Sequence, residues 1–245
     1  MARSYLDMND AISGSGGGIY SRQAGDFATP LPENSEDLVH IAGEEVIVGR
    51  KKFGSSTDYS TFDEDGTLRH VGAATIWDDI NISILPPTNA AGVPDVVAFN
   101  GDATLLCYSF HGTTTSVHKV ASSMEILHGY KEGSDIHFHV HWYPSNNVVA
   151  NVKWRLVYTW FNRGTVPGAS TTVTSVVATS GVAWQEQTTS WTISGAGKTM
   201  GSRLVFELQR DPADAQDTYT GGAAVTDMGV HYEKDSEGSN TILTK

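Results

Sequence analysis

The chain has 245 residues, of which 39% are hydrophobic and only 18% are charged. This composition is typical of a folded protein, and the length suits one large all-β domain or a smaller domain with an arm. The formal net charge of −12 opposes binding to a phosphate backbone, so nucleic acid is not expected as a partner.

The first residues of the chain give no indication of a targeting segment. The sequence MARSYLDMNDAISGSGGGIY has no apolar signal-peptide core, and no apolar run in the chain is long enough to span a bilayer. Cys107 is the one cysteine, so it cannot form an internal disulfide, and we expect it to be a buried structural thiol. We therefore expect a protein that is made in a cytoplasm and has neither a membrane partner nor a cofactor.

The first 66 residues are expected to form an extended N-terminal arm. They contain the glycine-rich run SGSGGG and the stretch TPLPENSED, and they show no sustained apolar periodicity. The glycine-rich run lacks a preceding strand, a following helix and a lysine, which favours a flexible arm over a phosphate-binding loop. The expected division is residues 1–66 for the arm and residues 67–245 for the folded domain.

Short strand patterns recur after residue 66, with turn residues between them. The expected strands cover residues 76–84, 96–99, 104–110, 117–127, 136–143, 152–161, 171–178, 182–193, 204–209 and 223–232. No segment shows a 3.6-residue apolar period over three turns, and many of the strands are expected in hairpin order. This pattern predicts an all-β fold, an antiparallel β-sandwich of jelly-roll type.

Three histidines alternate within the segment IHFHVHWYP. In an extended strand His137, His139 and His141 point to one face, because side chains repeat every two residues. Three interpretations remain open. The histidines are structural residues of a sheet or a subunit contact, they bind a non-catalytic metal on a symmetry axis, or they belong to a metalloenzyme.

The metalloenzyme interpretation requires more than this row. The spacing of Gly133, His139 and His141 matches the front half of the metal-cupin pattern, in which two histidines bind one metal. That pattern continues with a glutamate four or five residues later, where this chain has serine and asparagine. His231 is a candidate distant ligand, but it has no accompanying motif. His139 and His141 are therefore weak metal candidates, and no catalytic residue is predicted.

Clusters of aspartates give little indication of a further site. Asp78 and Asp79 are adjacent, so a strand directs them to opposite faces and they cannot act as a carboxylate pair. Asp211, Asp214 and Asp217 lie in the loop DPADAQDTYTGG without the spacing of a calcium loop, which favours a role in the turn.

The six tryptophans divide into two groups by their surroundings. Trp154 and Trp160 alternate within an apolar row and are expected in the core. Trp184 and Trp191 lie in the polar segment AWQEQTTSW. They are the better candidates for exposed contact with a glycan or with another subunit.

Four blocks of the sequence resemble a widespread family of structural proteins of tailed bacteriophages and prophages. The blocks are residues 63–83 (DEDGTLRHVGAATIWDDINIS), 130–145 (YKEGSDIHFHVHWYPS), 154–160 (WRLVYTW) and 210–233 (RDPADAQDTYTGGAAVTDMGVHYE). The recurring histidine pair of the family matches His139 and His141. The resemblance implies a jelly-roll β-sandwich, a homotrimer attached to a phage particle, and no chemistry.

The resemblance and the expected arm favour a non-enzymatic virion protein, a capsid decoration or cement protein that stabilises the head. Arms add buried area across subunit seams, and the expected partners are copies of the same chain and the major capsid protein or other virion proteins. The arm's apolar residues are expected to anchor it: Tyr5, Leu6, Ile19, Tyr20, Val46, Ile47 and Val48. The alternatives are a tail or head-fibre component that binds host glycan through Trp184 and Trp191, and a cupin-like metalloprotein.

Overall fold

The computed structural model describes residues 50–85, 92–242 and 244, which form thirteen β-strands and one short 3-10 turn. The elements are β1 (Lys51–Gly54), β2 (Tyr59–Phe62), β3 (Leu68–Val71), η2 (Gly72–Ala74), β4 (Ile76–Ile82), β5 (Asp95–Phe99), β6 (Asp102–Phe110), β7 (His118–Glu125), β8 (Ile136–Pro144), β9 (Asn151–Phe161), β10 (Thr171–Ala178), β11 (Gln187–Ile193), β12 (Arg203–Arg210) and β13 (Ala223–Lys234). No helix within the described ranges is long and apolar enough to cross a membrane.

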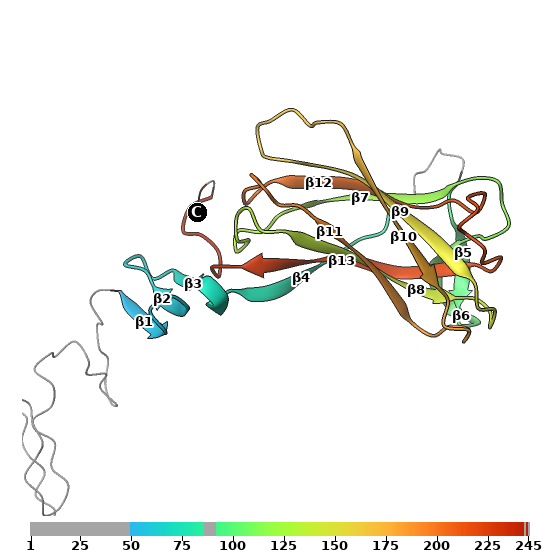
Figure 1. Ribbon diagram of the computed structural model, residues 1–245, viewed down its shortest axis with the longest axis horizontal. Helices are drawn as coiled ribbons and strands as arrows, with labels where there is room; N and C mark the ends of the chain where they lie inside the picture. Colours follow the sequence, from blue (N-terminus) through green and yellow to red (C-terminus); the bar gives the residue numbers. More distant parts are fainter. Residues whose placement is uncertain (1–49, 86–91, 243, 245) are drawn as a thin grey trace, which may run out of the picture. The chain divides into compact units, whose positions relative to one another are not determined.

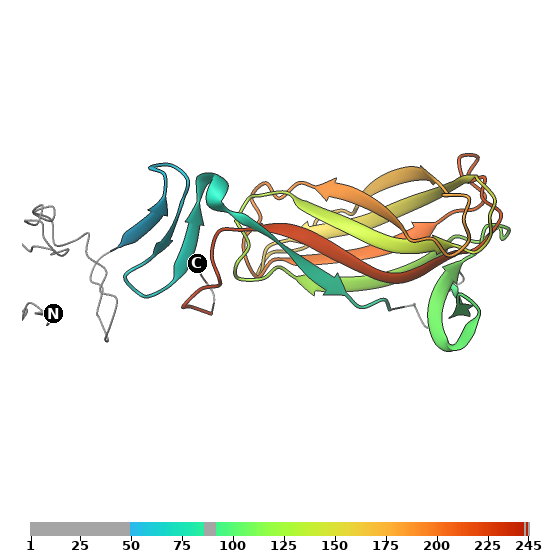
Figure 2. The ribbon, with the colours of Figure 1, turned by 90° about the horizontal axis from the view of Figure 1, so that it is seen from below.

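Ten of these strands form an antiparallel β-sandwich of jelly-roll type (Figure 1). One sheet has four strands in the order β10-β9-β12-β7. The other has six strands, in the order β11-β8-β13-β6-β5 with β4 paired to β13. Figure 2 shows β4 and β13 side by side along this second sheet. The predicted fold class is confirmed.

The core lies between the two sheets because each strand alternates buried and exposed residues. β8 and β9 turn their buried side chains toward each other across the sandwich, where the Trp142 and Trp154 rings lie 5.8 Å apart. Trp154 and Trp160 both belong to this core, as predicted. Burial of one such side chain contributes about 1.5–3 kcal/mol. Cys107 is also buried, and burial raises the pKa of its thiol.

The order of the strands differs from the expected run of hairpins. Within the sandwich, β5–β6 and β9–β10 are hairpins, but β6, β7, β8 and β9 alternate between the two sheets. The turn after Pro144 therefore carries the chain from the histidine strand in one sheet to the aromatic strand in the other. The sequence marks where each strand ends, whereas the partner of a strand depends on contacts far away in the chain.

The strands β1, β2 and β3 form a separate three-stranded sheet. β3 also meets the segment that follows β13, where the N–H of His70 donates to the carbonyl of Asp235 at 2.7 Å. The expected boundary between residues 66 and 67 falls between β2 and β3 of this sheet, so residues 51–62, which were expected to belong to an extended arm, include two of its strands. The seven expected arm contacts lie outside the described residues: Tyr5, Leu6, Ile19, Tyr20, Val46, Ile47 and Val48.

Candidate functional site

The outer face of the six-stranded sheet carries the histidine row. His137, His139 and His141 alternate along β8 with the core residues of that strand, so the prediction of a common face is confirmed. The three differ in environment, because His139 is only 4% exposed while His137 and His141 are half-buried.

Strand pairing brings two further side chains beside this row. β13 lies between β8 and β4, and His231 on β13 is opposite His137 on one side and Asp79 on the other. The next position of the row places His139 opposite Gly229. Side chains from three strands that are distant in sequence thus meet on one surface.

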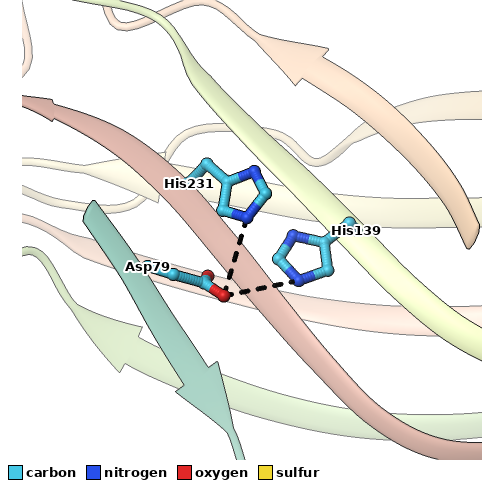
Figure 3. A group of neighbouring side chains, drawn as sticks. All are labelled: Asp79, His139 and His231. Carbon is cyan, nitrogen blue, oxygen red and sulfur yellow. Dashed lines mark ion pairs between the residues drawn. The ribbon is translucent and has the colours of Figure 1, made fainter. Parts of the chain in front are cut away.

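Asp79, His139 and His231 form the tightest cluster of this surface (Figure 3). The Oδ2 atom of Asp79 lies 3.8 Å from Nε2 of His139 and 3.6 Å from Nε2 of His231. The centroids of the two imidazole rings are 4.4 Å apart. One metal-ligating atom from each residue lies within 4.8 Å of the other two.

Gly229 provides the space in which this cluster forms. A Cβ atom at position 229 would lie 2.7 Å from Cε1 and Nε2 of His139 and 3.0 Å from Oδ1 of Asp79. These separations are shorter than van der Waals contact, so the imidazole occupies the place that a side chain at 229 would fill. A glycine in the middle of a strand commonly marks such a close approach.

His139 is the buried member of the cluster. Burial lowers the pKa of its imidazole, the neighbouring His231 and His141 act in the same direction, and the carboxylate of Asp79 opposes them. The neutral form of His139 is therefore favoured. Its Nδ1 atom is buried and has no hydrogen-bond partner among the described residues.

A shallow hollow of about 510 Å³ borders the cluster. It is lined by Trp77, Asp78, Asp79, His137 and His231. The indole of Trp77 is exposed and lies 5.2 Å from the His137 ring, measured between ring centroids. Asp79 and His231 thus face an open, partly aromatic space.

The rings of His139 and His141, which the sequence proposed as a metal pair, lie 5.0 Å apart between centroids, but they have different acidic neighbours. His139 joins Asp79 and His231, whereas His141 lies 3.2 Å from Glu186 and 3.9 Å from Asp227. Asp79 supplies a carboxylate beside His139 that the cupin spacing lacks. No local signal in the sequence marks it, because the proximity arises from the pairing of β4 with β13.

The expected pair of exposed tryptophans is not present. Trp191 is only 7% exposed and packs in the core beside Phe138, so its predicted exposure is wrong. Its position on β11 directs it between the sheets even though the flanking residues are polar. Trp184 is half-buried, contacts the ring of Phe99, and has a left-handed backbone with φ of 61°. All six tryptophans lie within the described ranges, and among them Trp77 alone is exposed.

Each aspartate of the loop between β12 and β13 contacts a basic side chain of a strand. This arrangement agrees with a role in the turn, since the carboxylates tie the loop to the sheet. The pairs are Asp211 with Arg155 at 2.8 Å, Asp214 with Lys153 at 2.6 Å, and Asp217 with the fully buried Arg210 at 2.8 Å.

No protein-family model matches the chain, and no curated protein sequence matches it. Among solved structures, a family 35 carbohydrate-binding module from an environmental isolate is similar over 60% of this chain and 91% of its own, with 12% identity and a TM-score of 0.32. The CBM22-2 xylan-binding domain of Paenibacillus barcinonensis Xyn10C is similar over 64% and 91%, with 11% identity and a TM-score of 0.32. TmCBM61 in complex with β-1,4-galactotriose is similar over 65% and 88%, with 8% identity and a TM-score of 0.31. Similarity at this level carries no information about ligand or partner.

Proposed function

We propose that the chain is a non-enzymatic structural protein of a tailed-phage particle, which acts by assembling with copies of itself and with other virion proteins. The specific role that we propose is that of a trimeric decoration protein on the phage head. The four sequence blocks that resemble phage structural proteins support the class. An exposed apolar hairpin in the sandwich supports assembly, and it is the observation on which the proposal rests.

This hairpin is β5–β6, and among the described residues part of it has no second partner strand. Only Tyr108, Ser109 and Phe110 of β6 pair with β13, so the rest of β6 is paired with β5 alone. Val96 of β5 and Leu106 of β6 are 59% and 65% exposed on one face of the hairpin, and the adjacent Leu105, which is 55% exposed, points to the other face.

A two-stranded ribbon is marginally stable in water by itself, and grouped exposed apolar side chains mark contact surfaces. β5 is moreover an edge strand, whose free backbone groups can accept another strand. Copies of the same chain are the proposed occupants, because a closed symmetric oligomer repeats one such contact in every subunit.

The oligomeric state tests the assembly. The full chain should be a trimer in native mass spectrometry at micromolar concentration, and Leu106→Glu should dissociate it because the substitution places a charge within the contact. Val166→Glu is the control, since Val166 is even more exposed than Leu106 but lies in the loop between β9 and β10. A monomeric parent chain, or a Leu106→Glu variant that remains as trimeric as the control, contradicts the proposal.

Binding to particles tests the virion assignment separately. In the proposal the N-terminal arm anchors the protein, so deletion of residues 1–35 should abolish attachment to particles and leave the trimer intact. The copy number in purified particles locates the protein. A number comparable with that of the major capsid protein indicates decoration, and a much smaller number indicates a tail or vertex position. Attachment without the arm, or absence from particles, counts against the assignment.

A further inference from the structure

We infer that Asp79, His139 and His231 bind one divalent transition-metal ion per chain on the outer face of the six-stranded sheet. Two imidazole nitrogens and one carboxylate oxygen suit Zn²⁺ and its first-row neighbours, whereas Mg²⁺ and Ca²⁺ prefer sites made of oxygen alone. This inference does not depend on the virion assignment, because it follows from the geometry of one chain.

The separations between the ligand atoms are close to those of a bound ion. Zinc lies about 2.0–2.1 Å from its nitrogen and oxygen ligands, so two ligands in a tetrahedral site are roughly 3.3 Å apart. The distances from Asp79 Oδ2 to the two Nε2 atoms are 3.8 and 3.6 Å. Asp79 and His231 are exposed side chains, so small rotations can close the remaining gap while His139 stays fixed by burial.

An ion also explains the environment of His139 better than an ion pair does. The imidazole is buried against Gly229, yet its Nε2 is 3.8 Å from the carboxylate, which is longer than a hydrogen bond. The Asp79 carboxylate thus forms no hydrogen bond with Nε2, and neutral imidazole is the commonest metal ligand in proteins. A metal ion between His139, Asp79 and His231 would satisfy Nε2 and use the space that the glycine leaves.

The surroundings favour a cation and leave it accessible. The carboxylates of Glu186 and Asp227 lie beside His141 on the same face, and the whole chain is acidic. Three protein ligands leave at least one coordination position open. Since Asp79 and His231 both line the hollow, water can reach that position from this side.

Metal titration of the purified full chain tests the site. After removal of metal with a chelator, Zn²⁺ binding is measured by calorimetry, and Co²⁺ binding by the visible absorption that reports coordination geometry. We expect one ion per chain, and Mg²⁺ and Ca²⁺ should not compete. Asp79→Asn and His231→Gln alter exposed side chains and should fold. Each should weaken binding by at least about tenfold, since even residues behind the ligands contribute 10- to 100-fold.

The matched controls are Asp78→Asn and His137→Gln, which change neighbouring residues of β4 and β8 outside the cluster. They should bind Zn²⁺ as the parent chain does. The inference is overturned if the parent chain does not bind Zn²⁺, or if controls and cluster variants lose affinity equally. It is also overturned by one ion per three chains, which would place the metal on a symmetry axis instead.

Discussion

Gly229 of β13 lies directly opposite His139 of β8, and the His139 imidazole occupies the place that a side chain at position 229 would take. The strand pairing fixes this relationship, because opposite residues on one face of a sheet are the closest side-chain neighbours. The missing side chain lets the ring lie against the backbone of β13, with its Nε2 toward Asp79. Gly229 thus makes room for the His139 ring within the cluster.

Replacement of Gly229 by alanine should therefore disrupt the cluster. The added methyl group would lie 2.7 Å from the ring, so the imidazole or the strand must move. We expect the free energy of unfolding to fall by about 1–3 kcal/mol, measured by urea denaturation, and Zn²⁺ affinity to fall with it. Gly168→Ala is the control, because a Cβ there meets no atom within 4 Å. Equal stability of the two variants would refute the proposal that the His139 ring occupies the space left by Gly229.

The Arg210–Asp217 pair should be the most sensitive ionic contact among the described residues. Arg210 is fully buried, and its guanidinium donates two hydrogen bonds to Asp217 and one each to the carbonyls of Phe110, Tyr219 and Gly221. Asp217→Asn leaves a buried cation without its counter-charge, so we expect a loss of about 3–5 kcal/mol in the free energy of unfolding.

The control for this prediction is Asp211→Asn, which breaks the partly exposed pair between Asp211 and Arg155. Pairs of that kind contribute up to about 1 kcal/mol. Denaturant unfolding of both variants measures the difference. Similar losses in the two would contradict the assigned role of the buried pair.

The stability of the fold should decrease below neutral pH, in part because of His118. Burial lowers the pKa of its imidazole, and the nearby His111 and Arg210 act in the same direction while Asp95 opposes them. Its Nδ1 accepts a hydrogen bond from the backbone N–H of His111 at 3.1 Å, which protonation would break. The unfolded chain then binds more protons than the folded one. The contribution of His118 to the free energy of unfolding is fully present above pH 6.5, the ordinary pKa of histidine. It is lost as the pH decreases toward the lower pKa that His118 has in the folded chain.

His118→Asn tests this dependence, because asparagine retains an acceptor near the position of Nδ1 but does not titrate. The slope of unfolding free energy against pH below 6.5 should decrease by up to about 1.4 kcal/mol per pH unit. Part of the slope should remain, since burial also lowers the pKa of His139. An unchanged slope in the variant would exclude His118 as a source.

A buried hydrogen bond of the core gives a further prediction. Nε1 of Trp142 donates to Oγ1 of Thr189 at 3.0 Å, and both side chains are buried. Thr189→Val keeps the shape but removes the acceptor, so thermal and urea unfolding should show a loss of about 1–3 kcal/mol. Thr174→Val on the exposed side of β10 should change stability little. A loss as small in Thr189→Val as in this control would show that the bond contributes nothing.

The sequence by itself determined the ten strands of the sandwich, though not β1, β2 and β3, together with the common face of the histidines and the burial of Trp154 and Trp160. These features follow from alternation between adjacent residues, and a strand converts that alternation directly into two faces. The turn at Asn100 and Gly101 is also local, and both residues have positive φ in the structure.

Tertiary structure alone decided which strands pair, and with them the composition of the site. Asp79 and His231 meet His139 because β13 lies between β4 and β8, a choice that depends on packing across the whole sandwich. The same long-range packing buried Trp191, whose polar neighbours had indicated exposure. Local patterns specify the direction in which a side chain points. Its neighbours are decided by strand pairings that join distant parts of the chain.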